Sequence, residues 1–136
     1  MENSVLATSG QTVDDMYKYL ETNDRLAVAS RTLEWRHMAP TAPDTLWCHP
    51  YLDQDPFILS STPDIYIIGN QPSFATTMIN ASAPGSAEAG TNQRTDKVRC
   101  RVILLPKFCE SGMLVLVETR TLECKSIQVD VGLLGG

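Results

Sequence analysis

Histidine and cysteine are the side chains best able to bind a transition metal or to act as a nucleophile, and this chain has few of either. It holds two histidines and four cysteines in 136 residues. His37, Cys48 and His49 would make an incomplete and irregularly spaced ligand set. The cysteines, at positions 48, 100, 109 and 124, match neither paired zinc knuckles nor a compact disulfide framework. We therefore expect structural histidines, reduced thiols and no cofactor. A Cys48–His49 nucleophile pair stays open, although neighbouring side chains usually diverge.

Charge and composition narrow the function classes. The formal net charge is −5, whereas a surface that tracks phosphates needs clustered Lys and Arg, so direct DNA binding by this chain is not expected. A modest basic cluster (Lys97, Arg99, Arg101 and Lys107) fits an edge strand protected from self-pairing better than a nucleic-acid site. No apolar run approaches a membrane span, and the N-terminus lacks a secretory pattern, which predicts an intracellular protein with no membrane contact.

The N-terminal elements predicted from the pattern are a short strand and two helices. A strand over residues 5–9 ends at Gly10, and a helix should begin at Thr12, whose hydroxyl would form a capping box with Asp15. A second helix, capped by Asp24, should run to about Glu34. Two prolines three residues apart then require a fixed, irregular loop over residues 36–48, in which Asp44 is placed to accept backbone amides of its own turn.

The rest of the chain is predicted to be mainly β-structure. Residues 48–63 form a long surface excursion, since prolines and acids prevent regular structure. Residues 64–69 are apolar and β-branched and end in glycine, which is typical of a central strand covered on both faces. Strands at 100–105, 113–119 and 125–131 suggest an antiparallel meander. Residues 80–97 have almost nothing to bury and are expected to be a mobile loop.

The proline loop also carries a family resemblance. Residues 35–46 read WRHMAPTAPDTL and closely resemble a signature segment of the DNA polymerase delta small (B) subunit family. Residues 8–11 with the following Asp14-Asp15, residues 55–58 and residues 69–74 agree with the same family in order and spacing. The signature positions are Arg36, His37, Pro40, Thr41, Pro43, Asp44 and Thr45.

This resemblance implies a fold and an incomplete domain. The expected class is α/β (α+β): a partial calcineurin-like phosphoesterase sandwich with two short N-terminal helices and then mainly β-strands, including the C-terminal antiparallel meander. Residues 1–136 would be the C-terminal portion of that domain, without the OB-fold and the first half of the domain. We expect such a piece to be unstable alone, because its sheet would expose unpaired edges.

The resemblance also implies that the catalytic centre has degenerated. In catalytically active archaeal relatives, the exonuclease small subunits of D-family polymerases, a histidine precedes the glycine that opens the Asp-Asp helix, and Gly-His-x-His follows the later central strand. Here Ser9, Asn70 and Pro72 occupy these former metal-ligand positions. Hydroxyl and amide groups are poor ligands for transition metals, and proline offers no donor atom. No catalytic residue and no metal site are therefore expected.

The function that the resemblance implies is a non-catalytic scaffold subunit of DNA polymerase delta in nuclear replication and repair. It would bind the catalytic subunit, through that subunit's C-terminal cysteine-rich region, and a further accessory polymerase subunit. DNA would be contacted only indirectly, through the complex. The sequence does not indicate which residues touch the partners. Two alternatives stay open: an active metallophosphoesterase or nuclease, and a generic protein-interaction module.

Overall fold

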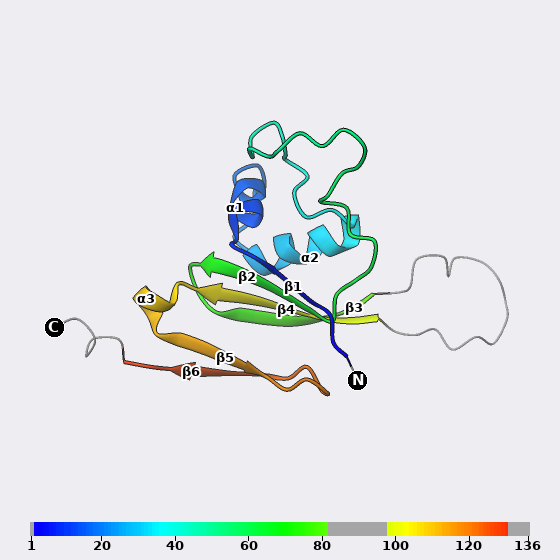
Figure 1. Ribbon diagram of the computed structural model, residues 1–136. Coiled ribbons are helices and arrows are strands. Elements are labelled where there is room, and N and C mark those ends of the chain that lie inside the picture. The colour runs from blue at the N-terminus through cyan, green and yellow to red at the C-terminus, as the bar shows by residue number, and fades with distance from the viewer. Residues whose placement is uncertain (1, 82–97, 131–136) are drawn as a thin grey trace, which may run out of the picture.

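The computed structural model describes residues 2–81 and 98–130 and confirms an α+β fold. The elements in chain order are β1 (Val5–Thr8), α1 (Gln11–Tyr17), α2 (Arg25–Trp35), β2 (Ile65–Gln71), β3 (Ala75–Ala81), β4 (Val98–Pro106), α3 (Phe108–Ser111), β5 (Met113–Val117) and β6 (Cys124–Gln128). The helices α1 and α2 cover one face of a four-stranded sheet, and the β5–β6 hairpin lies on the other face (Figure 1). No helix in the described part of the chain is long and apolar enough to cross a membrane.

The four-stranded sheet is mixed and has the order β1-β2-β4-β3. β2 pairs in parallel with both β1 and β4, whereas β3 runs antiparallel to β4. The central strand predicted over residues 64–69 is confirmed as β2, which has a partner on each side. Because β1, β2 and β4 are parallel, their carboxyl ends lie together at one end of the sheet, which we call the strand edge. This places residues 9, 70 and 106 near one another.

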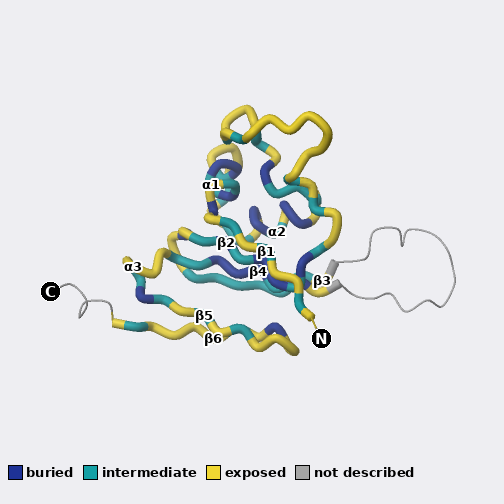
Figure 2. Tube along the Cα trace, in the orientation of Figure 1, coloured by how far each residue is buried: buried dark blue, intermediate teal, exposed yellow. Residues whose placement is uncertain are grey.

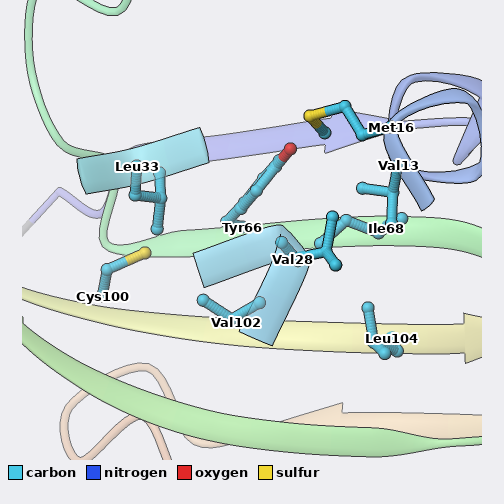
Figure 3. Close-up of a cluster of buried hydrophobic side chains, with 10 residues drawn as sticks. Val13, Met16, Val28, Leu33, Tyr66, Ile68, Cys100, Val102 and Leu104 are labelled. Carbon is cyan, nitrogen blue, oxygen red and sulfur yellow. The ribbon is translucent and has the colours of Figure 1, made fainter. Parts of the chain in front are cut away.

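The main core lies between the helices and the sheet. Val13 and Met16 of α1, with Val28 and Leu33 of α2, pack against side chains of β2 and β4 (Figure 3). The sheet contributes Tyr66, Ile68, Cys100, Val102 and Leu104. Burial raises the pKa of the Cys100 thiol to about 12, so this thiol is an unreactive part of the core. All four cysteines are free.

A smaller core joins the hairpin to the opposite face of the sheet. It is built on buried Ile65, Ile103 and Leu122, the last from the turn between β5 and β6. Arg101 in β4 fixes this turn, because its Nε donates a hydrogen bond of 2.6 Å to the Leu122 carbonyl. Both faces of the central strands are therefore covered, which explains their nearly continuous apolar sequences.

Two predictions for the N-terminal helices have different outcomes. The Asp24 cap is confirmed, since Asp24 Oδ1 accepts a 3.0 Å hydrogen bond from the Ala27 amide at the start of α2. The Thr12–Asp15 capping box is wrong. The N-cap of α1 is Gly10 and has no side-chain cap, while the buried Thr12 hydroxyl has no hydrogen-bond partner among the described residues. Asp15 is unavailable for capping because other residues, described below, bind its carboxylate.

The predicted C-terminal meander is only partly correct. β5 and β6 pair antiparallel, but β4 lies in the other sheet between β2 and β3. The short helix α3 separates β4 from β5, so the chain changes face instead of turning back beside β4. The edge-strand explanation for Arg99 and Arg101 is also wrong, because β4 is an interior strand. Residues 82–97, most of the predicted mobile loop, lie outside the described residues, whereas residues 80 and 81 belong to β3.

Candidate functional site

The ends of β1 and β2 bring together two of the three positions, Ser9 and Asn70, that the family resemblance predicts to be former metal-ligand positions. Ser9 follows β1, and Asn70 lies near the end of β2, where its Nδ2 donates a 2.9 Å hydrogen bond to the Ser9 carbonyl. Asn70 has a φ of 55°, a left-handed conformation that asparagine tolerates better than most residues. Pro72 follows β2 directly. Ser9, Asn70 and Pro72 thus line the strand edge, where the Asn70–Ser9 hydrogen bond joins the ends of β1 and β2.

A groove of about 360 Å³ opens beside this edge, and its side chains do not suit a two-metal centre. Asn70, Gln71 and Pro72 meet Lys107, Glu110 and Ser111 in its lining. Its one carboxylate, Glu110, forms a 3.0 Å ion pair with Lys107 and thereby raises the pKa of that lysine. Within residues 2–81 and 98–130, no three His, Cys, Asp or Glu side chains gather as a metal-ligand group. Two-metal hydrolysis needs several such ligands, and the described residues do not supply them at this edge.

A polar network occupies the adjoining turn between β1 and α1. Arg25, the first residue of α2, forms an ion pair with Asp14 and donates a 3.2 Å hydrogen bond to Gln71 Oε1. The Arg25 guanidinium also lies 4.3 Å from the centre of the Tyr17 ring, within range of a cation–π contact. Gln71 is only 3% exposed, and its amide donates to the Gly69 carbonyl. Asp14, the first acid of the Asp-Asp pair, is therefore paired with Arg25, a residue that the sequence motif did not indicate.

Gly10 allows this turn to approach the end of β2 closely. Its φ is 91°, in the left-handed region that favours glycine. A Cβ atom at this position would lie 2.1 Å from the Gly69 carbonyl oxygen and 2.7 Å from Gln71 Nε2. The close packing of β1 and β2 at the strand edge thus depends on a glycine at position 10.

We call the proline loop over residues 36–48, which carries the family signature, the signature loop. Asp15 anchors its second half. Thr41 and Thr45 both donate side-chain hydrogen bonds to Asp15 Oδ2, the second over 2.7 Å. The Asp15 residue is only 4% exposed, and Lys18 approaches its other oxygen at 3.3 Å. The hydrogen bond from Thr41, then that from Thr45, lowers the pKa of Asp15 below its usual value. This carboxylate joins α1 to the loop.

Arg36 anchors the other end of the loop to the excursion. The Arg36 carbonyl accepts a 2.8 Å hydrogen bond from the Leu59 amide, and the Met38 amide donates to the Phe57 carbonyl. The Arg36 guanidinium donates to the carbonyls of Leu59 at 3.1 Å and of Ser60 at 3.2 Å. The loop therefore holds α1 at one end and residues 57–60 at the other.

The histidines have structural partners. His37 Nε2 lies 2.8 Å from Asp55 Oδ2, while its Nδ1 accepts a hydrogen bond from the Ala39 amide. The bond from His37, followed by that from the Phe57 amide, lowers the pKa of Asp55. His49 packs edge-on against Tyr51 with the ring centres 5.3 Å apart. Among the described residues, His37, Cys48 and His49 are not gathered as a metal-ligand group.

The role expected for Asp44 is wrong. Asp44 is exposed and makes no hydrogen bond with the described residues, so it does not hold the turn. The carboxylate of Asp15 holds the loop instead. Asp15 lies 26 residues before Thr41 and 30 residues before Thr45. The Ala42–Pro43 peptide bond is cis. Pro40 and Pro43 are exposed, and Pro40 lines a small apolar depression with Trp35.

Comparison with known proteins identifies a family match over the N-terminal part of the chain, which contains the signature loop. Residues 1–76, which include β1, both N-terminal helices, the signature loop and all of β2, match the model of the DNA polymerase alpha/epsilon B-subunit family. The chain belongs to this family. It is 42% identical over 122 residues to the DNA polymerase delta small subunit of Oryza sativa subsp. japonica, a match that covers 90% of this chain and 25% of the relative. The resemblance predicted from the signature loop is confirmed.

Two further small subunits extend the match. The Arabidopsis thaliana DNA polymerase delta small subunit is 42% identical over 122 residues, covering 90% of this chain and 25% of the relative. The Saccharomyces cerevisiae small subunit is 35% identical over 150 residues, covering 93% of this chain and 28% of the relative. The chain thus spans about a quarter of the length of the curated relatives it matches.

Proposed function

We propose that the chain is part of a non-catalytic accessory subunit of DNA polymerase delta, acting in DNA replication and repair. The observation that carries this proposal is the 42% identity to delta small subunits over 90% of the chain. A nuclear location follows from replication as the function. In this proposal the chain is the C-terminal portion of an inactivated phosphoesterase-like domain.

The chemistry of the strand edge supports the non-catalytic role. Ser9, Asn70 and Pro72 supply a hydroxyl, an amide and no donor at all, where active relatives are expected to carry imidazoles. The nearby Asp14 and Asp15 are bound by Arg25 and by the loop threonines, respectively. The groups that remain hold backbone segments together, which is the role of a scaffold.

The proposed partners are the polymerase delta catalytic subunit, contacted through its C-terminal cysteine-rich region, and a further accessory subunit. The overall charge of −5 supports contact with DNA only through the complex, because phosphate binding needs clustered cations. The contacts of Asp15 and Arg36 with the signature loop support a scaffold role, since they hold the exposed residues of the loop in a fixed conformation.

Co-purification tests this function. A full-length subunit, meaning a polypeptide of the relatives' length that contains this sequence, is tagged and co-expressed with the polymerase delta catalytic subunit. We expect near-stoichiometric recovery of the intact catalytic subunit and loss of recovery when its C-terminal cysteine-rich region is deleted. Failure of the folded full-length subunit to recover any polymerase subunit would reject the proposal.

A further inference from the structure

Large apolar side chains are exposed at the end of the signature loop and on the excursion that follows it. Leu52 is 97% exposed, Trp47 87% and Tyr51 54%. Side chains of this size are usually at least partly covered, and exposed apolar side chains beside a groove commonly mark an interaction site. We call Asp44, Trp47, Tyr51, Leu52 and Asp53 the excursion surface.

A groove runs beside Tyr51, Leu52 and Asp53, whereas Trp47 lines a separate hollow with Asp15 and Lys18. The volume of the groove is about 560 Å³, and Tyr51, Leu52 and Phe57 line it together with Pro43, Pro50 and Pro56. Aromatic and proline side chains lose little conformational entropy when a ligand covers them, which favours binding. The groove could therefore accept an apolar side chain of a partner.

The charge of residues 41–58 restricts the kind of partner that could bind here. Residues 41–58 contain three aspartates and neither lysine nor arginine. The carboxylate of Asp55 contacts the His37 ring, but Asp44 and Asp53 are exposed and make no ion pair with the described residues. Such a surface repels nucleic-acid phosphates and attracts a protein segment rich in lysine or arginine.

The segment that carries the excursion surface is also fixed near both of its ends. Thr41 and Thr45 bind Asp15 at its beginning, and the pairing of Arg36 and Met38 with Phe57 and Leu59 fixes its end. Fixing both ends reduces the entropy lost when a partner binds. The excursion is largely exposed and projects from the helical layer, on the side away from the β5–β6 hairpin (Figures 1 and 2).

We propose that the excursion surface docks a segment of another polymerase subunit that carries lysine or arginine beside apolar side chains. An apolar side chain of that segment enters the groove, and its cations face Asp44 and Asp53. This inference rests on the proposed function, because the partner is taken to be a subunit of the same complex.

Matched variants of the full-length subunit test the docking surface. Tyr51→Ala is compared with Tyr19→Ala, whose tyrosine is 60% exposed just after α1, and Asp53→Lys is compared with Glu21→Lys, another exposed acid. Each variant is co-expressed with the catalytic and accessory polymerase subunits, and affinity for each partner is measured at several salt concentrations. We expect Tyr51→Ala and Asp53→Lys to weaken one partner at least about tenfold and the controls less than about twofold. The effect of Asp53→Lys should shrink at high salt.

The outcomes separate this inference from the proposed function. If the unmodified subunit recovers no polymerase subunit, the proposed function fails and the docking inference fails with it. If it assembles normally and both excursion variants assemble equally well, only the docking inference is overturned. Two further results would also overturn it: a lower melting temperature of the free subunit with Tyr51→Ala, which would show that the same polypeptide covers the groove, or self-association that Asp53→Lys abolishes.

Discussion

Replacing Gly10 with alanine should disrupt the junction between β1, α1 and the end of β2. Alanine in the left-handed conformation costs roughly 1–2 kcal/mol. The new methyl group would also lie 2.1 Å from the Gly69 carbonyl oxygen, a backbone atom that cannot rotate away. Forcing extra atoms into a packed site adds about 1–3 kcal/mol. We therefore expect Gly10→Ala to lower the free energy of unfolding of the full-length subunit by roughly 2–5 kcal/mol.

Gly69→Ala is the matched control, because it adds the same methyl group from the other side of this junction. Its Cβ would lie 3.4 Å from the Thr8 carbonyl oxygen, an ordinary contact, and its backbone is not left-handed. We expect a change within about 1 kcal/mol. Urea unfolding followed by circular dichroism measures both variants. Equal stabilities of Gly10→Ala and Gly69→Ala would refute the close approach described for this turn.

Three further predictions concern the signature loop in the full-length subunit. Because the folded-state pKa of Asp15 is lowered, its contribution to stability is present above the unfolded-state pKa and is lost as pH falls through the folded-state pKa. Thermal melts from about pH 6 to about pH 3 should therefore show a steeper loss of stability for the unmodified protein than for Asp15→Asn. Asp44→Ala should leave the melting temperature nearly unchanged, whereas Asp15→Ala should lower it; the reverse order would contradict the assignment of the anchor. Arg36→Lys cannot keep both guanidinium hydrogen bonds to the carbonyls of Leu59 and Ser60. It should therefore lower the free energy of unfolding, measured in urea, by about 1 kcal/mol. An unchanged urea midpoint would contradict this.

Local sequence signals predicted the elements that depend on nearby residues. The Asp24 cap acts on an amide three residues away, and the apolar run ending at Gly69 became the central strand β2. The family was also predictable, because its signature is a continuous segment of proline, threonine and aspartate. Such features can be inferred without knowing how distant segments pack.

Features that depend on distant contacts were missed or misassigned. Asp15 was expected to cap its own helix, but it binds threonines that follow the next helix. Arg25 begins α2, and nothing in its local pattern indicated its ion pair with Asp14 across the helix connection. β4 was assigned to a meander because its connection to β5 is short, yet α3 redirects the chain to the other face of the sheet. The strand β3 was not predicted, although its threonines and isoleucine favour a strand.

In the proposed function, the strand edge carrying Ser9 and Asn70 holds structure and performs no hydrolysis. Its most direct test is the manganese-dependent phosphodiesterase activity of the purified full-length subunit on a chromogenic diester and on single-stranded DNA. We expect no turnover above that of buffer with the same metal. Turnover that disappears in Asn70→Ala, while circular dichroism shows that the variant is folded, would contradict it.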